Sequence, residues 1–165
     1  MKQLLIVRHA KSSWDEAIKN DFDRPLNARG LKDAPAMANK MLDRKIVIDA
    51  FISSTAKRAI TTATFFYEEY KKRGIKTTGL IGVPELYLAS PIVFEETIGE
   101  TDNALNTIAI FSHNPGITEF ANSLTNVRVD EMPTCSVFAV QADVASWHQF
   151  MEAKKEFLFF DYPKM

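Results

Sequence analysis

The segment QLLIVRHA (3–10) joins five residues typical of a buried strand to an arginine and a histidine. Short apolar runs of the same kind recur at 50–53, 78–83, 107–112, 136–140 and 156–160. Most of these runs are continuous rather than alternating, as expected for strands covered on both faces of a sheet. Longer amphipathic stretches separate them, so the chain has the pattern of an α/β protein.

Helix candidates lie between these runs, at 31–44, 55–73, 91–99, 115–124 and 144–152. In the second candidate, Ala59, Ala63 and Phe66 recur at the 3.6-residue period of one helix face. Pro35 lies inside the first candidate, so we expect that helix to begin late or to bend there. These stretches are long enough to cross over between parallel strands.

The last two strand candidates, at 136–140 and 156–160, have no long crossover helix between them. Such a short connection favours an antiparallel pair at one edge of the sheet. We therefore predict a single three-layer α/β/α domain over 1–165, with helices on both faces of a mixed, mostly parallel sheet. The run at 156–160 is expected to be a core strand.

The composition excludes several classes of function. Apolar residues make up 46% of the chain, and 20 basic residues face 21 acidic ones, so no basic excess indicates nucleic acid or a membrane surface. Cys135 is the single cysteine, which fits a reducing compartment. The apolar run at 4–7 is too short for a signal peptide or a membrane span. We expect a cytoplasmic monomer or weak dimer.

Basic side chains follow the strand candidates. Arg8 and His9 follow the first, Arg58 comes shortly after the second, and His113 and Asn114 follow the fourth. Ligands of open α/β sheets bind beyond the carboxyl ends of the strands, so we expect these side chains to meet. Guanidinium groups bind phosphate oxygens in pairs of hydrogen bonds, and a neutral imidazole attacks phosphorus. This predicts phosphoryl transfer without a metal or other cofactor, with the second histidine protonated.

The proton donor for the leaving group stays open at this point. Glu85 follows the third strand candidate and could act as a general acid, or could simply pair with a nearby arginine. Asp15 and Asp23, in the loop after the first strand, are alternatives. A protonated phosphoimidazole also leaves without a dedicated acid. His148 lies in a polar helical stretch and is not expected to take part.

Four blocks in order resemble the histidine phosphatase superfamily. RHA (8–10) is similar to its RHG signature, and RHAKSSW (8–14) resembles its small phosphohistidine-phosphatase branch, the SixA-like proteins. The other matching blocks are DRPLNARG (23–30), SSTAKRAITTA (53–63), and the pair ELY (85–87) and SHNPG (112–116). Ala10 and Ser112 stand where the superfamily usually has glycine.

This resemblance implies a phosphoglycerate mutase-like fold and transient phosphorylation of His9. It implies a phosphate pocket made by Arg8, Arg58 and His113, with Asn114 beside it, and no metal. The implied substrate is a phosphohistidine on another protein. Two alternatives stay open: a small-molecule phosphomonoesterase with the same site, and a non-catalytic phosphate-binding module on the same fold.

Overall fold

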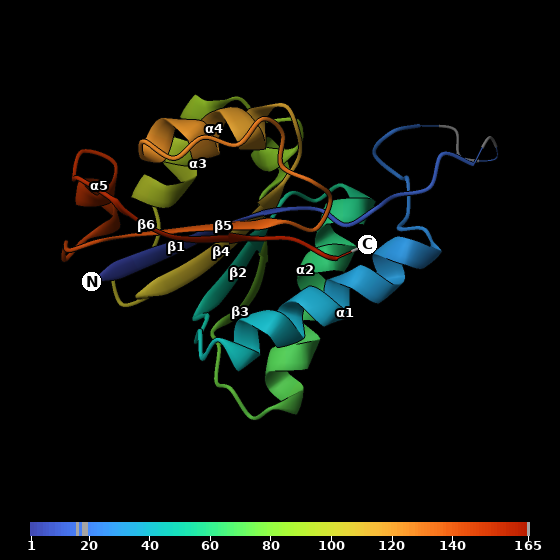
Figure 1. Cartoon of the computed structure of the whole chain (residues 1–165), viewed down its shortest axis with the longest axis horizontal. Helices are drawn as coiled ribbons and strands as arrows, with labels where there is room; N and C mark the ends of the chain where they lie inside the picture. Colours follow the sequence, from blue (N-terminus) through green and yellow to red (C-terminus); the bar gives the residue numbers. More distant parts are fainter. Residues whose placement is uncertain (16, 18–19, 165) are drawn as a thin grey trace.

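The computed structural model describes residues 1–15, 17 and 20–164, and a six-stranded sheet lies at its centre (Figure 1). The strands are β1 (Lys2–Arg8), β2 (Ala50–Ser53), β3 (Gly79–Gly82), β4 (Thr107–Ser112), β5 (Val137–Ala142) and β6 (Glu156–Asp161). The helices are α1 (Ala28–Asp43), α2 (Lys57–Lys72), the 3₁₀ turn η1 (Pro84–Leu86), α3 (Pro91–Gly99), α4 (Gly116–Leu124) and α5 (Trp147–Phe150).

The strand order in the sheet is β3-β2-β4-β1-β5-β6. The first four strands in this order are parallel, and crossover connections that contain helices join them along the chain. β5 runs antiparallel to β1, and β6 antiparallel to β5. The predicted mixed sheet with an antiparallel edge is therefore confirmed.

Alternate residues of β1 show how the two apolar cores divide. Leu4 and Ile6 join the core under α3, α4 and α5, whereas Leu5 and Val7 join the core under α1 and α2. In Figure 1 these two groups of helices lie on opposite sides of the sheet. Both faces of the strand are buried, which explains why its apolar run is continuous rather than alternating.

Three expectations about single elements are wrong. α1 begins at Ala28 rather than late, because Asn27 caps it by accepting a hydrogen bond from the Gly30 amide, and the helix then continues through Pro35. The expected helix at 144–152 is reduced to the four residues of α5. β6 is a half-buried edge strand rather than a core strand.

The carboxyl ends of three parallel strands meet at one edge of the sheet. Arg8 at the end of β1 pairs in register with Ser112 at the end of β4, and Ser53 ends β2 beside them. Residues that follow these strands are thus brought together from distant parts of the sequence. Within the described residues, no helix is both long and apolar enough to cross a membrane.

Candidate active site

His9, Arg58 and His113 meet at this edge of the sheet, each carried by a different element. His9 follows β1, Arg58 lies in the first turn of α2, and His113 follows β4. Their exposed fractions are only 6%, 3% and 1%. The two imidazole ring centres are 5.1 Å apart, and the Arg58 Nε–H donates to His9 Nε2 at 3.3 Å. With Arg8 they line a cavity of about 230 Å³.

His9 is held neutral, with one defined tautomer. Its Nδ1 lies 2.7 Å from the carbonyl oxygen of Ala10, which can only accept, so Nδ1 carries the proton and Nε2 keeps its lone pair. Burial lowers the pKa of His9 to about 3, and the charge of Arg58 acts in the same direction. At neutral pH, Nε2 is therefore an unprotonated nitrogen beside a guanidinium group.

His113 is oriented by Ser54. Its Nε2 lies 2.8 Å from the Ser54 hydroxyl, which also accepts a hydrogen bond from the Ala56 amide at 3.2 Å. The hydroxyl can donate to Nε2 or accept from it, and in the tautomer in which it donates the proton of neutral His113 lies on Nδ1. Burial lowers the pKa of His113 to about 3, with Arg58 adding to the effect. Without an anion in the cavity, His113 is therefore neutral, and its protonated form with phosphate bound stays a prediction.

Two buried nitrogen atoms of the cluster have no hydrogen-bond partner among the described residues. They are the Nε of Arg8 and the Nδ1 of His113. The other end of the Arg8 guanidinium is fixed, because its Nη1 donates to the Met132 carbonyl at 2.7 Å. Buried donors almost always have a partner, and an anion in the cavity would supply acceptors for both.

Asp21 also lines this cavity, and the sequence did not single it out. Its carboxylate accepts hydrogen bonds from the Arg58 Nη2 at 2.8 Å, from the Arg24 Nη1 at 3.0 Å and from the Tyr87 hydroxyl. Partial burial opposes ionisation, but the donors Tyr87, Arg58 and Arg24 outweigh it and hold the pKa of Asp21 well below its usual range. Asp21 is therefore ionised at neutral pH and holds no proton to donate.

The three carboxylates proposed as proton donors lie elsewhere. Glu85 is exposed in η1 and lines a different cavity, beneath α3. Asp15 and Asp23 are exposed and do not line the His9 cavity. Asn114 does line it, and its Nδ2 donates to the Met132 carbonyl at 3.3 Å, so the amide sits beside the backbone that Arg8 also contacts.

The two side chains that replace the usual glycines fit the site without displacing it. Ala10 is fully buried, and its amide donates to the Thr62 hydroxyl of α2 at 3.0 Å. The Ser112 hydroxyl donates to the Leu86 carbonyl at 2.6 Å, which joins the end of β4 to η1. The Ser112 side chain therefore adds a contact that glycine could not make, whereas the Ala10 hydrogen bond comes from its backbone and only its methyl group is new.

Comparisons with known proteins point to one family. Residues 4–81 match the family described as the histidine phosphatase superfamily (branch 1). An uncharacterized protein of Mycobacterium leprae is 30% identical over 122 residues, which cover 72% of this chain and 71% of that protein. An uncharacterized chloroplastic protein of Arabidopsis thaliana is 27% identical over 156 residues, covering 90% and 70%.

Solved structures share the fold over nearly the whole chain. SixA from Agrobacterium tumefaciens superposes with a TM-score of 0.80 at 22% identity, covering 99% of both chains. The protein histidine phosphatase SixA complexed with tungstate gives 0.77 at 21% identity, covering 97% and 96%. A mycobacterial glucosyl-3-phosphoglycerate phosphatase gives 0.68 at 14% identity, covering 99% and 100%. The predicted phosphoglycerate mutase-like fold is confirmed.

Proposed function

Because this chain belongs to the histidine phosphatase superfamily, we propose that it hydrolyses a phosphoryl group through a covalent phospho-His9 intermediate, with phosphohistidine of another protein as the substrate. The observation that carries this proposal is the neutral His9, whose Nε2 accepts a hydrogen bond from Arg58 in a cavity that Arg8 also lines. A nucleophile, cationic donors and a small cavity are the parts that phosphoryl transfer requires.

In the first step, the Arg58 Nε–H turns from His9 Nε2 to a phosphoryl oxygen, which frees the lone pair of Nε2. Nε2 then attacks phosphorus in line with the leaving nitrogen. The P–N bond of the substrate breaks as the new N–P bond forms, and the departing imidazole keeps the proton it carried as phosphoimidazolium. Arg8 and Arg58 bind the equatorial oxygens, where charge accumulates in the transition state. The Nδ1–H of His113 donates to the same oxygens.

In the second step, water attacks phosphorus and the bond to His9 breaks. The electron pair of the N–P bond returns to Nε2, so His9 regains its neutral Nδ1–H tautomer. Both protons of the water remain on the inorganic phosphate, or one of them passes to solvent. The hydrogen bond from Nδ1 to the Ala10 carbonyl stabilises the imidazolium character that develops in both steps. Asp21, already ionised, is placed to accept a hydrogen bond from the attacking water.

The small volume of the cavity favours a substrate that inserts only its phosphoryl group and the adjoining ring, while the rest of the substrate stays in solvent. A volume of about 230 Å³ holds a phosphoryl group and the ring next to it. Trp14 lies at the rim with 76% of its surface exposed, and the Arg24 guanidinium stacks on one face of its ring at 3.3 Å. The other ring face is available to a planar leaving group such as imidazole.

The reaction is tested by brief exposure of the protein to a substrate labelled with ³²P, followed by a quench in alkaline detergent, which preserves a phosphohistidine label. We expect an acid-labile, alkali-stable label on the wild type and on His148→Ala, the matched control that removes an exposed histidine of α5. The His9→Ala variant should carry no label and lose activity by at least about 10³-fold. EDTA should have no effect. Full activity of His9→Ala, or activity restored only by a metal, would overturn the mechanism.

The substrate class is tested by comparing kcat/KM for a phosphohistidine peptide, a sugar phosphate and a nucleotide. We expect the phosphohistidine peptide to be preferred by at least about tenfold. Preference for a sugar phosphate would assign a small-molecule phosphomonoesterase instead. Tight vanadate binding with no label on His9 would assign a phosphate-binding module.

A further inference from the structure

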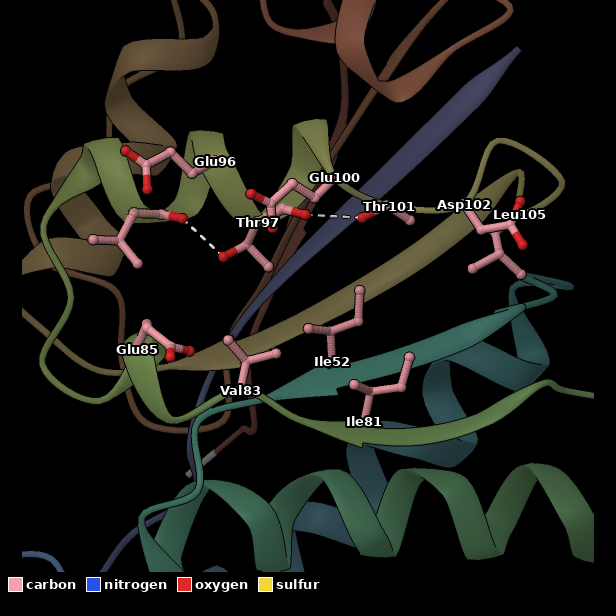
Figure 2. Close-up of a pocket in the computed structure, with 11 residues that line it drawn as sticks. Ile52, Ile81, Val83, Glu85, Glu96, Thr97, Glu100, Thr101, Asp102 and Leu105 are labelled. Atoms are coloured by element: carbon pink, nitrogen blue, oxygen red, sulfur yellow. Dashed lines mark hydrogen bonds between the residues drawn. The ribbon is translucent and has the colours of Figure 1, made fainter.

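A second and larger cavity, of about 510 Å³, lies between α3 and the β2–β3 end of the sheet (Figure 2). Its floor is apolar, and Figure 2 shows Ile52, Ile81 and Val83 pointing from the sheet toward α3. Ile81 belongs to the edge strand β3 and is 47% exposed. The floor thus leaves apolar surface in contact with water, which other protein surface could cover.

The rim of this cavity carries only one sign of charge. Its charged lining residues are Glu85, Glu96, Glu100 and Asp102, with no lysine or arginine among them. None of these four carboxylates forms an ion pair with a described residue. We call the cavity bounded by these four residues and Ile81 the acidic groove.

Two of the charges of the acidic groove oppose the stability of the helix beside it, whereas Asp102 also accepts a hydrogen bond from the Ala104 amide. Glu96 lies in the last turn of α3 and Glu100 caps its C-terminus, so the two like charges are one turn apart at the end where a helix favours positive charge. Both side chains are exposed beside Thr97, whose hydroxyl is already bonded to its own helix backbone. A cationic partner lying across the groove would turn this repulsion into attraction.

The acidic groove also adjoins the catalytic cavity. Glu85 lines the groove, and Leu88, three residues later, lines the His9 cavity. Three residues span at most about 11 Å even when fully extended, so one bound protein can reach both sites. The loop between them is held in place by the hydrogen bond from Ser112 to Leu86.

We propose, on the basis of the function given above, that the acidic groove docks a segment of the phosphorylated protein in which lysine or arginine side chains flank an apolar residue. The apolar side chain packs on the floor around Ile81, and the basic side chains pair with the rim carboxylates. The groove would then select which phosphohistidine protein is hydrolysed, and the His9 cavity would carry out the chemistry.

Two peptides test this docking. Each has one phosphohistidine and a Gly/Ser spacer of about eight residues, which spans on the order of 15 Å. One then ends in alternating lysine and leucine and the other in alternating glutamate and leucine. Each peptide is made in two versions, with the charged extension either before or after the phosphohistidine. For the wild type, we expect the lysine peptide to have at least a tenfold lower KM and a similar kcat, with the difference shrinking as salt is added.

The variant Glu96→Lys/Glu100→Lys should abolish this preference by raising KM for the lysine peptide. Its kcat/KM for free phosphohistidine, which is too small to reach the groove, should stay within about twofold of the wild type. The matched control is Glu68→Lys/Glu152→Lys, which makes the same change of charge at exposed positions on other surfaces. That control should retain the preference for the lysine peptide, because its added charges lie away from the groove and salt screens them from a bound peptide.

Binding without catalysis separates this proposal from the proposed reaction. A fluorescent lysine peptide lacking phosphate should bind the wild type and His9→Ala equally, and should bind Glu96→Lys/Glu100→Lys at least tenfold more weakly. If the peptides bind in this pattern but neither is hydrolysed, the proposed reaction is refuted and the proposed docking in the groove is supported. Equal binding of lysine and glutamate peptides, or an equal effect of both double variants, would refute the groove.

Discussion

Single residues decide the protonation state on which the proposed chemistry depends, and Ser54 is the clearest case. The sequence placed it in a matching block, but only the fold shows its hydroxyl 2.8 Å from His113 Nε2. We therefore propose that Ser54 is a positioning residue, which donates to Nε2 and so keeps the proton of His113 on Nδ1 for the phosphoryl oxygens.

We expect Ser54→Ala to weaken vanadate binding and lower kcat/KM by about tenfold, corresponding to about 1.4 kcal/mol, the value of one lost hydrogen bond in a buried site. Ser54→Thr should restore most of the loss. The control is Ser123→Ala, which removes a hydroxyl bonded only to the backbone of α4. If Ser54→Ala lost thermal stability but bound vanadate normally, the hydroxyl would have a structural role only.

Asp21 shows the limit of sequence reasoning at this scale. It stands in a loop beside Asp23, and nothing in the sequence distinguishes the two carboxylates. The fold makes the distinction, because Arg58 and Tyr87 contact only Asp21 among these acids. We expect Asp21→Asn to bind inorganic phosphate about tenfold more tightly, since it removes a negative charge from the cavity. Calorimetric titration measures this, with Asp23→Asn as the control; weaker binding would contradict it.

At the scale of elements, the close approach of η1 and its following loop to α4 shapes the site. Gly116 begins α4 three residues after His113, and a Cβ placed there would lie 1.8 Å from the Ala89 carbonyl oxygen. A side chain at this position must push the loop away from the strand ends. Because the same loop carries Leu88 into the His9 cavity, the displacement would reach the catalytic residues.

Gly116→Ala is therefore expected to destabilise the protein by about 1–3 kcal/mol and to lower kcat/KM, as overpacking usually does. Gly99→Ala is the matched control: it lies in α3 with no atom within 4 Å of the added Cβ, so it should be neutral or slightly stabilising. Urea unfolding of both variants, with activity measured beside it, checks the pair. Similar midpoints for Gly116→Ala and the wild type would be inconsistent with the close approach.

The elements themselves were largely predictable, because apolar period and crossover length are local properties. The strands at 50–53 and 107–112 and the helix at 91–99 have the predicted boundaries. Errors occurred where the apolar period does not record what decides the outcome. α1 starts early because of a polar cap at Asn27. The edge position of β6 was missed because its own sequence does not record which strands lie beside it.

At the scale of the whole molecule, the ends of the parallel strands bring the proposed catalytic residues together, and the same arrangement buries two neutral histidines. The four residues Arg8, His9, Arg58 and His113 were predictable because the topology rule places strand ends at one edge. Glu85 was misplaced because η1 turns its side chain to the other side of the loop, into the acidic groove. The site therefore depends on loop direction, which periodicity does not encode.

Burial of His9 and His113 should make the fold sensitive to mild acid. Their pKa values are about 3 in the folded protein and about 6.5 in an unfolded chain, so between these values the unfolded state binds more protons. The free energy of unfolding should therefore fall as pH decreases from 7 to 5, by up to about 1.4 kcal/mol per pH unit for each histidine.

Urea unfolding at pH 5, 6 and 7 measures this slope. His113→Gln should reduce it by about half, and His148→Ala should leave it unchanged, since His148 is exposed. A free energy of unfolding that stays constant over this range would show that the buried imidazoles titrate as they do in water, and that the site does not hold His9 as a neutral nucleophile.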